Sequence, residues 1–278
     1  MAEKFDDVLR EAMRHYAEHG FNDAEVLAQW MARLEAAMRA EMVPEWRMEE
    51  RLREALGSIY KREVDKGAAL KRHPGVQRYV LEQVKPELRN ELTRRIAANA
   101  ALIKLNRKQE VDATLRRFMG WASSVPAGGS NVVDVREERK KIRKGFASLS
   151  FRERRVLIDQ GHKLQSAVSS IVAQGGGAIA AVWHSHYHQA NYDYRVDHKD
   201  REIESKTKPY LVRGSWAMER GYIDKAGATY TDEIEQPGEF VFCRCSYRYL
   251  YNLRNLPASM LTAKGREALA EAKRKLAA

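Results

Sequence analysis

The chain has 278 residues, of which 44% are hydrophobic, and its formal net charge is +11. This length and apolar fraction predict one large or two moderate folded domains and exclude wholesale disorder. No apolar run is long enough to cross a bilayer, and the acidic N-terminus lacks the apolar core of a secretory signal, so we expect a soluble protein made in the cytoplasm. Two cysteines separated by one residue do not make a disulfide framework, which leaves metal binding or inert packing.

Charge is unevenly distributed along the chain. Residues 1–60 carry 8 Lys or Arg against 13 Asp or Glu, whereas residues 101–160 carry 14 against 7 and residues 241–278 carry 8 against 2. An acidic start followed by two basic zones suits a protein that meets a polyanion on one side and a protein partner on the other. A solvated helical surface explains the same pattern equally well.

Residues 1–122 are predicted to form a helical domain. Apolar residues recur there at three- and four-residue spacing, as in the stripe from Val26 to Met38. Asn22 is placed to cap that helix, and Pro44 to open the next one, where its missing N–H costs little. Residues 123–130 are rich in Ser, Gly and Pro, and we expect them to form a linker.

The segment after this linker is predicted to contain a long helix and a buried strand. Ser150 and Glu153 have the spacing of a capping box, which places the start of an amphipathic helix there. Three consecutive glycines from Gly175 end that helix. The apolar run 178–183 then predicts a short buried strand.

Periodicity weakens after Asn191, so loops and short strands are expected until about Arg254. We therefore expect a small α+β module over residues 131–257 and a basic helix over residues 258–278. The predicted fold class is α+β, with a mainly α-helical N-terminal half followed by a small module of short strands and a terminal helix.

A histidine-rich segment and the two cysteines form the most informative pattern in the sequence. Four of the eight histidines lie close together in the chain: His184, His186, His188 and His198. Zn²⁺ prefers thiolate and imidazole ligands, and four of them in a tetrahedral array make a closed structural site. If the segment around Cys243 and Cys245 is extended, both thiols lie on one face.

We expect His198, Cys243 and Cys245 to bind a structural zinc ion, with one of the earlier histidines as the fourth ligand. His184 represents that position here, and His186 and His188 fit the pattern equally well. The alternative is that the cysteines are small buried hydrophobes and that the histidines are solvated.

Five further residues have predicted roles. Trp183 and Trp216 are expected to be core anchors, because large aromatic side chains contribute most by burial. Arg195, Arg244 and Arg248 are candidates for contact with a protein partner or DNA, with simple solvent exposure as the alternative.

At these residues the chain resembles the phage head-morphogenesis, or minor head protein, family typified by the F protein of phage Mu. The C-terminal module of that family carries a Trp, an Arg-x-x-His element, a Gly-containing stretch and a closing Pro…Cys-Arg-Cys. The matching residues in this chain are Trp183, Arg195-Val-Asp-His198, Gly214-Ser-Trp216 with Gly221, and the segment from Pro237 to Cys245. The resemblance covers about residues 151–255. Members of the family usually have a glycine, in a turn, a few residues after the histidine. At that place this chain has Glu-Ile-Glu, residues 202–204.

The resemblance implies a virion component rather than an enzyme. Such a minor head protein is present in multiple copies at the portal vertex or in the capsid interior, and it acts in head assembly and DNA delivery. The helical half would dock on the portal protein or the major capsid protein, and the basic zones would contact packaged DNA through its phosphates.

Two other classes of function stay open. One is a zinc-dependent nuclease or hydrolase, because His-x-His-x-His beside a basic surface can bind a catalytic metal. The other is a non-specific DNA-binding protein without a phage context.

Overall fold

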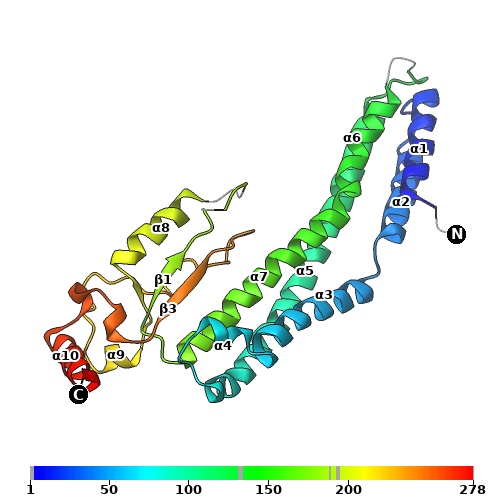
Figure 1. The fold of residues 1–278 in the computed structure, drawn as a ribbon. Coiled ribbons are helices and arrows are strands. Elements are labelled where there is room, and N and C mark those ends of the chain that lie inside the picture. Colours follow the sequence, from blue (N-terminus) through cyan, green and yellow to red (C-terminus); the bar gives the residue numbers. More distant parts are fainter. Residues whose placement is uncertain (1–2, 131–133, 188, 192–194, 278) are drawn as a thin grey trace. The chain divides into compact units, whose positions relative to one another are not determined.

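The computed structural model describes residues 3–130, 134–187, 189–191 and 195–277 (Figure 1). Its helices are α1 (Phe5–His19), α2 (Ala24–Glu41), α3 (Glu45–Tyr60), α4 (Ala68–Arg72), α5 (Arg78–Ser124), α6 (Val135–Ala147), α7 (Leu149–Gly175), α8 (Val196–Thr207), α9 (Trp216–Glu219) and α10 (Ala263–Ala277). Its strands are β1 (Ala180–His184), β2 (Tyr210–Leu211) and β3 (Ser246–Leu250). One π-helical turn, Lys61–Asp65, follows α3, and two 3-10 turns, Leu253–Asn255 and Ala258–Met260, precede α10.

These elements confirm the expected α+β class, with a mainly helical N-terminal half, a small sheet and a terminal helix. Across the described ranges, no helix combines the length and the apolar character that a membrane span requires.

The chain divides into two compact units whose limits differ from the expected domains. Unit 1 comprises Met1–Arg53 and Ile96–Leu157, and unit 2 comprises Glu54–Arg95 and Ile158–Ala278. The limits fall inside α3, α5 and α7, so each unit is built from segments that are distant in sequence.

One apolar core holds unit 1 together. Leu9, Met13 and Tyr16 lie at three- and four-residue spacing on α1 and are almost completely buried. They belong to a cluster that includes Met38 of α2 and Phe118 of α5. Full burial of one such side chain stabilises the fold by about 1.5–3 kcal/mol, so this stripe explains why the predicted helices pack where they do.

The predicted cap of α2 is wrong by one residue. Asp23, which has an extended backbone, accepts a hydrogen bond from the Glu25 N–H at 2.7 Å. Asn22 instead donates its side-chain amide to the His19 carbonyl, at the end of α1. Asp23 provides the same chemistry and adds a negative charge at the positive end of the helix dipole.

The segment expected to be a linker lies inside unit 1, packed against the end of α1. The Gly128 N–H donates to the His19 carbonyl at 3.1 Å, and the Ser130 N–H donates to the Ala17 carbonyl at 2.9 Å. Gly20 has a φ of 69°, and a Cβ there would lie 1.9 Å from the Pro126 carbonyl oxygen. Ser, Gly and Pro therefore serve a tight return that satisfies helix-end carbonyls.

The predicted capping box at Ser150 is also wrong. Because α7 begins at Leu149, Ser150 lies in its first turn. Glu153 does not reach back to the helix end; it forms a bidentate pair with Arg107 of α5, at 2.6 and 3.1 Å. Arg107 also donates to the Val43 carbonyl at 2.7 Å, so a buried ion pair joins three segments of unit 1.

Unit 2 contains a three-stranded antiparallel sheet in the order β2-β1-β3, and Figure 1 shows β3 beside β1. The central strand β1 overlaps the predicted apolar run, and it pairs with β3 from Ala180↔Leu250 to His184↔Ser246. It pairs with the short β2 only at Ala180 and Ala181. Side chains on both faces of β1 are buried, which explains its continuous apolar sequence.

The region after Asn191, expected to be loops and short strands, contains the helix α8. Its buried residues are His198, Glu202 and Ser205, which occupy one helical face but are all polar. A search for apolar periodicity therefore does not find this helix. The terminal helix α10 begins at Ala263, five residues later than the start predicted at residue 258.

Candidate metal centre

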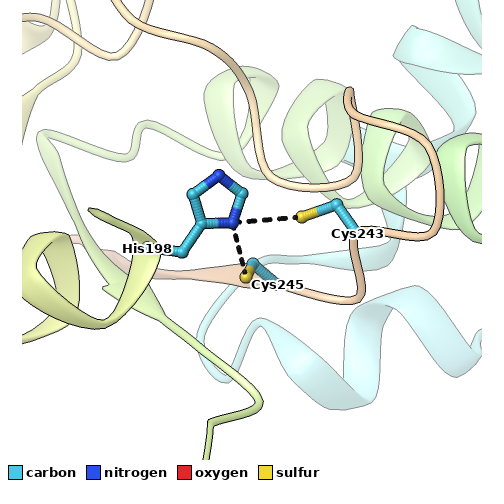
Figure 2. A group of neighbouring side chains, drawn as sticks. All are labelled: His198, Cys243 and Cys245. Carbon is cyan, nitrogen blue, oxygen red and sulfur yellow. Dashed lines mark hydrogen bonds between the residues drawn. The ribbon is translucent and has the colours of Figure 1, made fainter. Parts of the chain in front are cut away.

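Three buried side chains meet in unit 2, one from α8 and two from the loop before β3 (Figure 2). The Nδ1 atom of His198 lies 3.6 Å from Sγ of Cys243 and 3.4 Å from Sγ of Cys245. Their exposed fractions are 2%, 2% and 6%. The three donor atoms lie within 4.8 Å of one another, so this group could hold a metal ion. The structure thus brings together the three ligands predicted first.

Two hydrogen bonds, donated by β1 and by the residue that follows it, orient the helix that carries His198. Because β2 is so short, Trp183 and Ser185 lie beyond its pairing with β1. Their N–H groups donate instead to α8: Trp183 to the Ser205 hydroxyl at 2.9 Å, and Ser185 to a Glu202 carboxylate oxygen at 2.7 Å. Both acceptors share a helical face with His198, so these bonds fix the direction in which His198 points.

Glu202 is a functional residue that the sequence did not indicate. Burial opposes its ionisation, but hydrogen bonds from the Ser185 N–H and the Lys206 ammonium group outweigh burial and hold its pKa below the usual range. The charged carboxylate therefore serves as the acceptor that joins α8 to β1. The four-residue spacing from His198 would have been a signal, but only once a helix was assigned there.

The proposed fourth ligand lies elsewhere. The His184 side chain is 57% exposed, and its Nδ1 atom lies 3.7 Å from Glu202. Within the described ranges, the metal-ligand group comprises only the three residues named above. His186 lines a cavity together with both cysteines, and its backbone N–H donates to the sulfur of Cys245. His188 lies outside the described residues.

The two cysteines lie in a loop rather than in an extension of the strand, since β3 begins only at Ser246. The alternation expected of a strand nevertheless holds: Cys243 and Cys245 are buried and Arg244 is exposed. Both thiols therefore point to the same side, as predicted from their spacing.

The cysteine loop is anchored to α7. Phe242 has a φ of 60°, in the left-handed region that residues other than glycine rarely adopt. Its N–H donates to the Asp159 carboxylate at 2.6 Å, and Asp159 also pairs with Lys163 at 3.1 Å. The Ser166 hydroxyl donates to the Pro237 carbonyl at 2.5 Å. These contacts stabilise the strained turn that directs Cys243 inward.

The two thiols share one proton. A hydrogen bond from Cys245 lowers the pKa of Cys243, and the same hydrogen bond raises the pKa of Cys245. The Gly238 N–H, 3.4 Å from the Cys243 sulfur, also favours the thiolate. The lowered pKa favours the thiolate of Cys243, and the thiolate is the form that binds metal.

The surroundings of His198 also suit a metal ligand. Its ring lies edge-on to the Trp183 ring, at 5.0 Å between centroids, and the Asp197 carboxylate lies 3.8 Å from its Nε2 atom. At this distance the contact is electrostatic and not a hydrogen bond, and Nε2 has no hydrogen-bond partner among the described residues. The imidazole is thus held between an aromatic wall, a carboxylate and two sulfurs.

Of the two predicted core anchors, Trp183 belongs to the site. It is fully buried and packs with Tyr210 and both cysteines. Trp216 is only partly buried; its indole N–H donates to the Gly177 carbonyl at 3.1 Å, and its ring packs against a separate apolar cluster.

The three predicted contact arginines are all exposed. The guanidinium of Arg195 lies 4.7 Å from the ring centroid of Phe240 and donates to the Val241 carbonyl. Arg248 projects from β3, and Arg244 lines the cavity beside the cysteines. Their contact with DNA or a protein partner stays a prediction.

Comparison of the sequence with protein-family models finds no match, and comparisons with the curated proteins and with the solved structures find no significant similarity. The family resemblance therefore depends on the residues quoted for it and on how they are arranged.

Proposed function

We propose that this chain is a structural minor head protein of a bacteriophage and that one zinc ion stabilises its unit 2. The ion would be bound by His198, Cys243 and Cys245 with one further ligand. The observation that carries the zinc site is the spacing of the three donor atoms.

This spacing fits tetrahedral zinc. With Zn–N bonds of about 2.0 Å and Zn–S bonds of about 2.3 Å, a tetrahedral site places nitrogen and sulfur about 3.5 Å apart. The observed separations of 3.4 and 3.6 Å agree with this value. An imidazole with two thiols is also a donor set that favours zinc over magnesium or calcium.

Burial supports a structural role for the ion rather than a catalytic one. A hydrolytic zinc keeps an open coordination position with a general base beside it. Glu202, the buried carboxylate on α8, already accepts a hydrogen bond from the Ser185 N–H and pairs with Lys206 at 3.1 Å. It is therefore held as part of the scaffold.

The arrangement of the family-like residues supports the assignment to phage heads. Trp183, His198, Cys243 and Cys245 are distant in sequence but form one packed cluster. Residues that define one folded module are expected to pack together in this way, even when they are far apart in the sequence. In this proposal, the helices of unit 1 dock on the portal protein or the major capsid protein. The basic zones contact packaged DNA inside the virion through its phosphates.

The test is to look for the chain in phage particles. Particles purified from the phage that encodes it should contain the protein, and a Cys243→Ser phage should yield fewer or incomplete heads. A Ser246→Ala phage is the matched control at an exposed neighbouring position. Normal particles that lack the protein would contradict the proposal.

A zinc-dependent nuclease or hydrolase is the second candidate. One observation favours it: both cysteines line a cavity of about 380 Å³, from which a solvent ligand could reach the ion. This candidate requires metal-dependent cleavage of DNA that is lost in His198→Ala. The head-protein proposal expects no cleavage by either form.

A further inference from the structure

The cavity beside the cysteines, about 380 Å³ in volume, is lined by two arginines, by neutral polar side chains, by two tyrosines and by the cysteines themselves. Arg72 ends α4, His162 and Gln165 lie on α7, His186 follows β1, and Arg244 lies between the two cysteines. Neither Asp nor Glu is among the lining residues in the part of the chain that the structure describes. A cavity with this lining favours an anionic ligand.

Arg244 acts on both histidines of the cavity. Burial is the main cause that lowers the pKa of His162, and the charge of Arg244 lowers it further; the Asp159 carboxylate, which is paired with Lys163, acts in the opposite direction. For His186, burial again comes first, followed by His184 and then by Arg244. The guanidinium group therefore lies near both rings, on the same cavity.

Arg72 adds positive charge at the same cavity. The buried carboxylate of Glu63 pairs with both Arg62 and Arg72. One carboxylate neutralises only one of the two guanidinium groups, so this trio carries a net charge of about +1. Its charge adds to that of Arg244.

The metal centre would not cancel this positive charge. Two thiolates bound to Zn²⁺ with a neutral imidazole have no net charge. This step rests on the proposed zinc site, because without the ion the Cys243 thiolate would offset part of the charge of Arg244.

We propose that this cavity binds the phosphate group of a nucleotide or of a nucleic-acid strand. Arg244 and Arg72 would supply charge-assisted hydrogen bonds, and the hydroxyl of Ser169 and the amide of Gln165 would supply neutral ones. The volume exceeds that of a lone phosphate and falls in the range of small-molecule sites, which leaves room for a sugar or base.

The test is isothermal titration of the zinc-loaded, full-length chain with inorganic phosphate, a 5′-mononucleotide and a ten-nucleotide single strand. Arg244→Gln should weaken phosphate binding by roughly tenfold or more, the effect of losing a hydrogen bond to a charged group. Arg220→Gln removes the same charge from an exposed position of unit 2 outside the cavity and should change binding less than about twofold. Equal losses in the two variants would overturn the proposal.

A second variant keeps the test valid if Arg244→Gln disturbs the cysteine loop. Gln165→Glu lies on α7 and places a negative charge in the cavity, so it should also abolish phosphate binding. The proposal fails if neither the nucleotide nor the strand shows binding that weakens with salt and is lost in Gln165→Glu. If the strand alone binds, the source is the nucleic-acid backbone; if the mononucleotide competes, it is a free nucleotide. Zinc content measured on the same samples distinguishes failure of the phosphate site from failure of the zinc site.

Discussion

The buried His73 makes the stability of unit 2 sensitive to acid. Only 2% of this residue is exposed; its Nε2 atom lies 2.9 Å from the Ser169 hydroxyl and its Nδ1 atom 2.8 Å from the Tyr251 hydroxyl. Burial, and then the charge of Arg72, lower the pKa of His73 to about 4. The neutral ring is therefore the form that the fold accepts.

The direction and size of the effect follow from this pKa. An unfolded histidine has a pKa of about 6.5, so between about pH 6.5 and pH 4 the unfolded chain binds more protons than the folded one. Stability is therefore lost as pH falls through that window. From the two pKa values we expect His73 to remove about 2 kcal/mol of unfolding free energy between pH 7 and pH 5.

The assay is urea unfolding of the wild type and of His73→Asn at both pH values. Asparagine keeps a polar group near Tyr251 but does not titrate in this range, so the wild type should lose about 2 kcal/mol more than the variant. Ser169→Ala is the control, because it removes a hydrogen bond but leaves His73 buried and titrating. If wild type and His73→Asn lose equal stability, the reasoning is refuted.

Three further outcomes are expected. His186→Ala should lower zinc affinity by roughly tenfold or more, whereas His184→Ala should not, because His186, unlike His184, lines the cavity with the cysteines. Competition with a chelator measures this, and the reverse order would make His184 the ligand. Glu202→Ala should lower the unfolding free energy by about 1–3 kcal/mol, because it leaves the buried Ser185 N–H unpaired. Glu204→Ala, at an exposed position of the same helix, should cost under about 0.5 kcal/mol. Similar losses for the two variants in urea titrations would count against the α8–β1 connection. Arg107→Lys cannot keep the bidentate pair with Glu153 in unit 1, so it should lower the unfolding free energy by about 1–3 kcal/mol. An unchanged melting temperature would show that the pair contributes nothing to stability.

The sequence predicts the local elements of this fold better than their assembly. The apolar stripe of α2 and the glycines that end α7 are signals contained in short windows, and both elements lie where they were expected. The helix α8 was missed because its buried face is built from His198, Glu202 and Ser205, whose partners lie on β1. No property of that segment alone shows that polar side chains will be buried there.

The unit limits were missed for a related reason. A Ser, Gly and Pro segment is typical of a linker, but here its N–H groups satisfy carbonyls at the end of α1. The unit limits instead fall inside uninterrupted helices, at Arg53, Arg95 and Leu157, where the sequence shows no change of composition. Only the distribution of tertiary contacts reveals them.

For the site, ligand chemistry selects His198, Cys243 and Cys245, and the structure brings these three together. Spacing alone could not choose a fourth histidine, because β1 ends at His184 and the chain then leaves the sheet. Two neighbours of the centre, Glu202 and Asp159, were not indicated either, since each acts through a backbone N–H from another element.

Elemental analysis of the purified full-length chain, compared with Cys243→Ser, tests the central claim most directly. We expect one zinc ion per chain in the wild type. In the variant we expect loss of the ion together with a clear drop in melting temperature, because binding free energy at a structural zinc site is also folding free energy. Ser246→Ala should keep both the metal and the stability. A wild-type chain that contains no metal and melts at the same temperature as Cys243→Ser would contradict the account.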